Sequence, residues 1–236
     1  MKENINGVEC EYEYVRRETN DGNTVVFLHG WGGGLESFSG AFRAVTDMGV
    51  PALNFAFPKK VPSDWGVYDY ASYLNNFLRS KDISDPIVIG HSFGGRIGII
   101  TAAQGLCSKL MLVDSAGMRP HFCLRKKLAV ARYHRSIKRG KPLDGSGSID
   151  YNNTDPEMRG VFVRIVNTHL EKLLPYIKCP TLIVWGRTDG ETPPYMAKRL
   201  NARIDGSRLE YLDGGHYAYV ESHYGFVRLV KSFITE

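Results

Sequence analysis

Short runs of apolar residues recur along the chain, and most are followed by a longer stretch in which apolar residues return every three or four positions. The runs at 25–28 and 182–185 are apolar throughout, which indicates strands that are buried on both faces. Such strands alternating with helices are typical of a parallel sheet that carries helices on both sides. We therefore predict an α/β fold with a mostly parallel, doubly wound sheet of about eight strands.

The elements are predicted from this spacing and from the turn residues between them. An antiparallel edge strand is expected at 10–15, after the turn signal Asn6-Gly7. The core strands are predicted at 24–28, 52–55, 87–89, 110–113, 181–185 and 208–212. The helices are predicted at 37–47, 68–79, 94–104, 195–201 and 219–234.

The spacing breaks once, between Asp114 and Pro180, where the chain is about twice as long as a crossover helix with its loops requires. An insertion is expected there, with one helix near 124–131 and a second at 162–174. Between them, residues 140–156 are rich in Gly, Ser, Asn and Asp. This segment is interpreted as a mobile lid over a site, with a flexible surface loop as the alternative.

The pattern Gly-x-Ser-x-Gly occurs at residues 90–94, directly after one predicted strand and at the start of a predicted helix. In that context it predicts a nucleophile elbow, a strained turn that exposes the hydroxyl of Ser92. The flanking glycines let the strand and helix approach each other without a Cβ clash. The pattern alone would occur by chance in about one such chain in ten, so the prediction depends on its flanking elements.

A serine hydroxyl is a weak nucleophile unless a neighbouring base removes its proton. His216 follows the last predicted strand and precedes the final helix, which places it at the carboxyl edge of the sheet, where open α/β folds bind ligands. It is therefore the predicted base. The other six histidines are weaker candidates: His29, His91, His121, His134, His169 and His223.

The carboxylate that orients the base is expected after the preceding strand, where Asp189 lies. Its predicted role is to hold the tautomer of His216 and to stabilise the imidazolium that forms during attack. The chain order Ser, Asp, His is the order expected for this kind of sheet. Asp114, which also ends a strand, is the alternative acid, and Asp213 is interpreted as a turn residue.

A glycine-rich loop, H-G-W-G-G-G at residues 29–34, follows the first parallel strand. We expect the backbone N–H of Trp31 to pair with that of Phe93 as an oxyanion hole. The loop lacks the G-K-[ST] ending of a P-loop and the spacing of a dinucleotide site, so nucleotide binding is not expected. The residues expected to line the substrate pocket are His29, Gly30, His91 and Tyr217.

Composition adds limits to this picture. The chain has no apolar run long enough to span a membrane and no start of secretory type, so a cytoplasmic protein is expected. The four cysteines, Cys10, Cys107, Cys123 and Cys179, show no metal-binding spacing. Neither a metal nor another cofactor is therefore expected.

The net charge of +5 comes from one segment, 119–141, which contains no acidic residue. We interpret it either as the solvated face of a helix or as a site for an acidic partner or an anionic substrate. Nucleic-acid binding is not expected, because no aromatic-interleaved basic groove accompanies the charge. The nine basic residues are Arg119, Arg125, Lys126, Lys127, Arg132, Arg135, Lys138, Arg139 and Lys141.

Together these motifs resemble the α/β-hydrolase superfamily, from the strand before His29 to the helix after His216. The resemblance is nearest to small capped esterases and carbon–carbon bond hydrolases, and it implies hydrolysis of a small-molecule ester through an acyl-enzyme on Ser92. It also implies a helical cap at 118–178 on a core of residues 1–117 and 179–236. The matching segments are 29–32, 90–95, 179–181, 185–186, Asp189 with 192–193, and 215–216.

One segment departs from the family pattern. After the strand ending at Phe55 such proteins commonly carry Asp-x-x-Gly-x-Gly-x-Ser, whereas this chain continues A-F-P-K-K-V-P-S. The local turn and pocket wall are therefore expected to differ. Because one triad serves several reactions, carbon–carbon hydrolysis and thioester hydrolysis are alternatives to ester hydrolysis, and a non-catalytic ligand sensor is an alternative of another class. The sequence indicates no oligomeric state.

Overall fold

The computed structural model describes residues 1–16, 23–121, 135 and 148–236. The helix predicted near 124–131 and most of the basic segment 119–141 lie outside these residues. None of the helices in the described ranges is long and apolar enough to cross a membrane.

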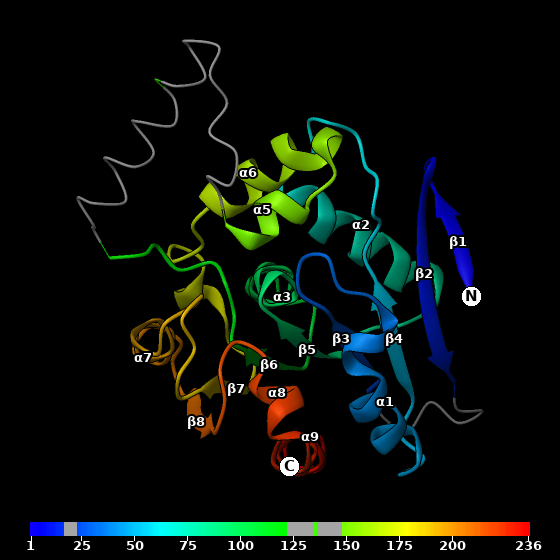
Figure 1. Ribbon diagram of the computed structural model, residues 1–236. Helices are drawn as coiled ribbons and strands as arrows, with labels where there is room; N and C mark the ends of the chain where they lie inside the picture. The colour runs from blue at the N-terminus through cyan, green and yellow to red at the C-terminus, as the bar shows by residue number, and fades with distance from the viewer. Residues whose placement is uncertain (17–22, 122–134, 136–147) are drawn as a thin grey trace.

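An eight-stranded sheet, in the order β1-β2-β4-β3-β5-β6-β7-β8, runs through the centre of the molecule (Figure 1). The ladders from β4 to β8 are parallel, whereas β1 and β2 join antiparallel at one edge. This confirms the predicted mostly parallel, doubly wound sheet. The strands are β1 (Lys2–Ile5), β2 (Val8–Val15), β3 (Val25–Leu28), β4 (Ala52–Ala56), β5 (Ile87–His91), β6 (Lys109–Val113), β7 (Thr181–Gly186) and β8 (Arg208–Leu212).

Helices cover both faces of the sheet. The side chains of α2, α3 and α7 pack into one apolar core, and those of α1 and α9 pack into a second core on the opposite face. Helices α5 and α6 lie together at the top of Figure 1, away from α1 and α9. The helices are η1 (Leu35–Phe38), α1 (Ser39–Thr46), α2 (Val67–Ser80), α3 (Phe93–Ala103), α5 (Ile149–Asn153), η2 (Pro156–Met158), α6 (Arg159–Asn167), η3 (Leu174–Tyr176), α7 (Tyr195–Asn201), α8 (Ala218–Glu221) and α9 (His223–Thr235).

The amino-terminal edge differs from the prediction of a single edge strand. Strand β1 pairs with β2 as a hairpin and forms the edge itself. The turn between them is Asn6-Gly7, where both residues have positive φ (53° and 85°). The prediction missed β1 because its residues are half-buried or exposed and carry no apolar run.

Two helices predicted in the second half of the chain end earlier or break. The helix predicted at 162–174 is α6, which ends where Thr168 turns extended, with its hydroxyl donating to the Arg164 carbonyl. The helix predicted at 219–234 is divided into α8 and α9 at Ser222, which adopts φ −108° and ψ 45°. The Ser222 hydroxyl donates to the Asp213 carbonyl at 2.6 Å, so the break fastens the helix to the loop before it.

The segment 140–156, which the sequence predicted as a loop, contains α5 in its described part. The hydroxyl of Ser148 caps this helix by accepting from the Tyr151 N–H, and the Thr154 hydroxyl donates to the Asp150 carbonyl at its other end. Capping side chains thus favour a short helix in a sequence whose composition is typical of loops.

Strands β3 and β5 are parallel neighbours, but the connections that leave them run to opposite sides of the sheet. The chain passes from β3 to β4 on one side and from β5 to β6 on the other. In open α/β sheets a crevice forms at the carboxyl ends of such a pair. The loops after β3, β5, β6, β7 and β8 open at this edge, and they carry Trp31, Ser92, Asp114, Asp189 and His216 respectively.

Candidate active site

Ser92 lies between β5 and α3 with φ 47° and ψ −106°, in a region that residues with a side chain rarely adopt. Its N–H donates to the Val113 carbonyl at 3.0 Å, and its carbonyl accepts from Ala116 at 3.1 Å. A Cβ on Gly94 would collide with the Leu28 carbonyl, so only glycine lets the helix lie this close to β3. The strained turn is therefore held in place by the sheet on one side and the helix on the other.

The imidazole of His216 is bonded to the carboxylate of Asp189, with Nδ1 2.9 Å from Oδ2. Asp189 Oδ1 accepts from the backbone N–H groups of Glu191 and Thr192, and the Thr192 hydroxyl donates to Oδ2 at 2.5 Å. Burial raises the pKa of Asp189, but the hydrogen bonds from His216 and Thr192 outweigh it, so the pKa falls below its usual value. The carboxylate is thus held ionised against the ring.

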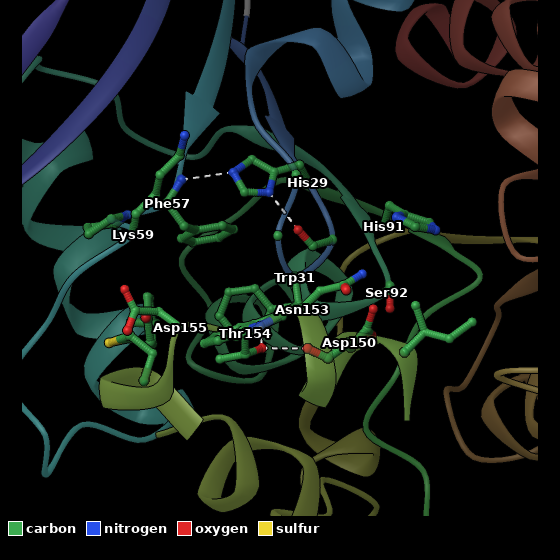
Figure 2. Close-up of a pocket in the computed structure, with 18 of the residues that line it drawn as sticks. His29, Trp31, Phe57, Lys59, His91, Ser92, Asp150, Asn153, Thr154 and Asp155 are labelled. Carbon is green, nitrogen blue, oxygen red and sulfur yellow. Dashed lines mark hydrogen bonds between the residues drawn. The ribbon is translucent and has the colours of Figure 1, made fainter. Parts of the chain in front are cut away.

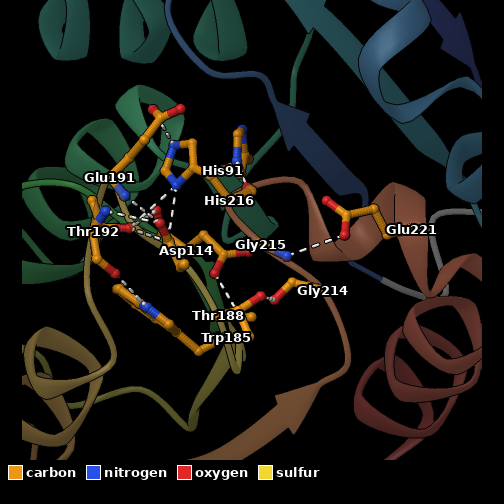
Figure 3. Close-up of polar contacts among 12 residues, drawn as sticks. His91, Asp114, Trp185, Thr188, Glu191, Thr192, Gly214, Gly215, His216 and Glu221 are labelled. Carbon is orange, nitrogen blue, oxygen red and sulfur yellow. Dashed lines mark hydrogen bonds and ion pairs between the residues drawn. The ribbon is translucent and has the colours of Figure 1, made fainter. Parts of the chain in front are cut away.

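The loop that carries His216 is fixed by contacts at its other residues (Figure 3). The Gly214 carbonyl accepts from the Thr188 hydroxyl at 2.9 Å, and the Gly215 N–H donates to Glu221 Oε2 at 3.1 Å. Asp213, interpreted as a turn residue, pairs with Arg187 on the surface. The bonds of Gly214 and Gly215 join the loop to the segment after β7 and to α8, so the ring position depends on these two elements as well as on β8.

Two opposing influences set the pKa of His216. Burial lowers it, but the hydrogen bond and charge of Asp189, together with the charge of Glu191, raise it, and the net pKa is above the usual value. Because Asp189 accepts the Nδ1 proton, the neutral ring presents a bare Nε2. That nitrogen is the atom able to receive a proton from a nucleophile.

A cavity of about 670 Å³ contains Ser92 and His216 in its wall. Figure 2 shows side chains from the loop after β3, from the elbow and from α5 around it. Within the described residues no hydrogen bond joins the Ser92 hydroxyl to His216 Nε2, which instead faces Glu191 Oε2 at 3.5 Å. The cavity also includes all the other predicted site residues except Asp189, which lies behind His216: His29, Gly30, Trp31, His91, Phe93 and Tyr217.

The two amides expected to hold an oxyanion both have free hydrogen atoms. Phe93 is the first residue of α3, where helix N–H groups have no partner within the helix. Neither its N–H nor that of Trp31 has an acceptor among the described residues. Both residues line the same cavity as Ser92, so their amides are available to negative charge developing there.

His29 and His91 are buried, and their bonds indicate a structural role. His29 Nε2 accepts from the Phe57 N–H at 2.9 Å while Nδ1 lies 2.6 Å from the Gly30 carbonyl. His91 Nε2 lies 2.8 Å from the His216 carbonyl. Burial lowers both pKa values, that of His91 to about 3, so both rings are neutral. His29 ties the glycine-rich loop to the segment after β4, and His91 supports the backbone of His216.

The segment after β4, where the chain departs from the family pattern, forms one wall of the cavity. Residues 57–60 line it, and Phe57 packs edge-on against Phe93, with ring centroids 4.9 Å apart. The Phe57 N–H is the donor to His29. An aromatic contact and one hydrogen bond therefore hold this wall in place of a glycine-rich turn.

Sequence reasoning missed the cavity residues that follow residue 148. Asp150, Asn153, Thr154, Asp155 and Met158 all line it. The missed signal is the capping pattern of α5, because a helix there places Asp150 and Asn153, three residues apart, on one side. Glu191 was also missed, although it lies only two residues from the predicted acid.

Trp31 connects the glycine-rich loop to this second segment. Its indole N–H donates to the Thr154 hydroxyl at 2.9 Å, and its ring lies 5.3 Å from that of Phe162 in α6. Thr154 is only 7% exposed. The bond therefore closes one side of the cavity.

Thr154→Val is expected to lower the free energy of unfolding by about 1–2 kcal/mol, because it leaves the indole N–H without its partner. Urea unfolding measures this change, and the KM of any substrate should rise as the α5 wall loosens. Thr154→Ser keeps the hydroxyl and serves as the control. A loss in Thr154→Ser without a loss in Thr154→Val would show that the methyl group, and not the Trp31 bond, holds the wall.

Asp114, the alternative acid, does not bond to His216. Its Oδ1 accepts from the Gly186 N–H at 2.7 Å, and its backbone carbonyl lies 3.1 Å from the Thr192 hydroxyl oxygen, whose proton is donated to Asp189 Oδ2. Its Oδ2 is buried and has no partner among the described residues. Burial raises the pKa of this carboxyl to about 8, so it is neutral at neutral pH. The bonded partner of the imidazole is Asp189.

Asp114→Asn is expected to make stability less dependent on pH. The pKa of Asp114 is about 8 in the folded chain and near 4 in the unfolded chain, so this group's stabilisation is lost as pH rises between these values. Asparagine removes that loss. From about pH 5 to about pH 9 the variant should gain on the order of 4 kcal/mol relative to the wild type in urea unfolding. Parallel curves for the two proteins would contradict a neutral Asp114.

No group of three or more His, Cys, Asp or Glu side chains is placed to hold a metal ion in the ranges that the structure covers. Cys107 and Cys179 lie close, with 3.8 Å between the sulfur atoms, but outside the cavity.

Comparison with known proteins agrees with this architecture. The family model described as "Alpha/beta hydrolase family" matches residues 25–229. A 2-hydroxy-6-oxo-2,4-heptadienoate hydrolase of Pseudomonas putida is 22% identical over 90% of this chain and 89% of its own. The structure of an enol-lactonase from Burkholderia xenovorans LB400 matches with a TM-score of 0.80 and 19% identity over 100% of both chains. An esterase from Exiguobacterium antarcticum matches with a TM-score of 0.77 and 19% identity over 98% of this chain and 97% of its own.

Proposed function

We propose, since the chain belongs to the alpha/beta hydrolase family, that it is a serine hydrolase that cleaves a small-molecule carboxylic ester through an acyl-enzyme on Ser92. The observation that carries this proposal is the bond from His216 Nδ1 to a buried, ionised Asp189, in a cavity wall that also contains Ser92. A base oriented in this way beside a serine at a strained turn supports acyl transfer.

In the proposed reaction Ser92 Oγ attacks the ester carbonyl while its proton passes to His216 Nε2. The carbonyl oxygen becomes an oxyanion that accepts from the N–H groups of Trp31 and Phe93, each worth about 3 kcal/mol to the transition state. His216 then gives its proton to the departing alcohol. In the second half His216 takes a proton from water, the resulting hydroxide attacks the acyl carbon, and Ser92 regains its proton. Asp189 stabilises the imidazolium in both halves.

The cavity wall contains residues from inside and from outside the predicted insertion, which supports a division of the chain into core and cap. Loops after β3 and β5 contribute Trp31 and Ser92, whereas Asp150 and Met158 come from within residues 118–178. We propose that residues 118–178 form a cap whose side chains determine substrate specificity. Most of the basic segment proposed to meet an acidic partner lies outside the described residues.

Carbon–carbon bond hydrolysis is the second candidate. It is favoured by the relative from Pseudomonas putida, whose name states that it hydrolyses a hydroxy-oxo-dienoate. The same attacking and proton-transfer groups serve this reaction, but a carbanion leaves in place of an alkoxide. The charge in the cavity is mixed, because Lys59 and Lys60 line it together with Asp150, Asp155 and Glu191.

A substrate panel tests the proposal. Wild-type protein is assayed with p-nitrophenyl esters of short and medium acyl chains, with matched acyl thioesters and with a hydroxy-oxo-dienoate. We expect the highest kcat/KM on an ester. Preference for the dienoate would replace ester hydrolysis with carbon–carbon hydrolysis. Covalent labelling of Ser92 by a fluorophosphonate with no turnover of any substrate would favour the ligand sensor.

A further inference from the structure

Glu191 touches the one atom of His216 that the reaction needs free. Its Oε2 lies 3.5 Å from Nε2, on the opposite side of the ring from Asp189. The Glu191 N–H is itself a donor to Asp189, so the backbone that fixes the acid also places this second carboxylate. Its side chain is 54% exposed and lines the cavity, whereas that of Asp189 is fully buried.

The contact between Glu191 and Nε2 stabilises only one protonation state of the ring. In the neutral ring Asp189 holds the proton on Nδ1, so Nε2 is an acceptor that faces another acceptor. Once Nε2 carries a proton, the same two atoms form a charge-assisted pair. Glu191 therefore favours the imidazolium, in which His216 can no longer take the proton of Ser92.

Other ionisable groups also face this ring. Asp189 and Glu191 follow β7, Asp114 ends β6, His91 ends β5, and Asp150 comes from α5. At neutral pH burial keeps Asp114 and His91 uncharged. Burial also raises the pKa of Asp150, which has no direct bond to the ring among the described residues. Glu191 is thus the carboxylate beside Nε2 that is exposed enough to move.

We propose that Glu191 is a positioning residue that competes with Ser92 for His216 Nε2, so that the site is restrained until the Glu191 side chain moves aside. This inference rests on the proposed serine hydrolase function. A group of the substrate that enters this side of the cavity displaces the Glu191 carboxylate into solvent, where half of its surface already lies. At low pH, where His216 is protonated, the pair strengthens and activity falls.

The test is the pH dependence of kcat/KM in Glu191→Gln. Glutamine keeps the size of the side chain and leaves the backbone N–H to Asp189 intact, but it removes the charge beside Nε2. The kinetic pKa of the acid limb should fall by about half a unit, since the lost contact is partly exposed. Activity well below that limb should rise about threefold, whereas the plateau at higher pH should stay unchanged or rise.

Asp213→Asn is the matched control. It removes one negative charge from the loop that carries His216, but the Asp213 side chain is 91% exposed and, among the residues that the structure describes, pairs with Arg187 alone. Its acid limb should coincide with that of the wild type. Raising the salt concentration should lower the kinetic pKa of the wild-type acid limb toward the value in Glu191→Gln, because salt screens the exposed carboxylate. The kinetic pKa of the variant should change less.

The outcomes separate this inference from the function on which it rests. If Glu191→Gln and Glu191→Ala unfold at the temperature of the wild type and their acid limbs keep the wild-type kinetic pKa, the proposed role of Glu191 is overturned. The proposed hydrolase function is unaffected by that result. A lower rate at every pH with an unshifted limb also overturns the role of Glu191, because that result describes a substrate contact. Full activity in Ser92→Ala would instead remove the proposed function itself.

Discussion

Replacing Ser92 with alanine is expected to lower kcat/KM for the best ester by about 10⁴-fold or more. The reason is that Ser92 supplies the oxygen that first attacks the acyl carbon in the proposed reaction, and without it no acyl-enzyme forms and water must attack the intact ester. The residual rate then comes from the amides of Trp31 and Phe93 and from binding. Steady-state kinetics on purified protein measure the loss.

Ser115→Ala is the control for this variant. Ser115 is a fully buried serine close to the elbow, and its hydroxyl donates to the neighbouring Ala116 carbonyl at 2.9 Å. It should keep most of the activity. Both variants should unfold near the temperature of the wild type, since the Ser92 hydroxyl makes no hydrogen bond with the described residues and alanine inherits the same strained backbone. Comparable losses in the two variants would mean that packing at the elbow, rather than the Ser92 oxygen, limits the rate.

Asp189→Asn is expected to lower kcat by about 10⁴-fold while leaving the fold in place. The amide group of asparagine donates where the carboxylate accepted, so it favours the His216 tautomer with the proton on Nε2. That tautomer has no lone pair for the Ser92 proton. Two backbone N–H groups and the Thr192 hydroxyl donate to the two carboxylate oxygens of Asp189, and asparagine would leave them one acceptor oxygen in place of two.

Asp114→Asn distinguishes the two candidate acids. Asp114 ends the neighbouring strand but bonds to Gly186 and not to the imidazole. Its replacement is expected to change kcat by less than about tenfold. A loss as large as that in Asp189→Asn would assign the orienting role to both carboxyls, whereas a loss in Asp114→Asn alone would move it from Asp189 to Asp114.

Much of this fold could be predicted, because its buried strands are recognisable in the sequence as apolar runs. Strand β7, with six buried residues, is an example. The candidate site residues were predicted for a related reason: each follows a recognisable strand, and parallel strands bring their carboxyl ends to one edge. Ser92, Asp189 and His216 are far apart in sequence, yet the order of the strands alone places their loops together.

Other features depend on contacts that no local pattern expresses. Strand β1 is polar and exists because it pairs with β2, and α5 lies in a segment whose composition is typical of loops. The position of Glu191 against Nε2 follows from the turn that Thr192 and Asp189 make together, which involves three hydrogen bonds. The bond between Trp31 and Thr154 joins residues on different segments of the chain. These features require the folded chain.

Reaction with a fluorophosphonate, followed by mass spectrometry of the digested protein, tests whether Ser92 is the activated nucleophile. Such a reagent bonds only to a serine whose proton a base can remove. We expect one adduct, on the peptide that contains Ser92, which forms faster as pH rises through the pKa of His216 and is absent in His216→Ala. An adduct on another serine, or none on Ser92 in folded wild-type protein, would contradict it.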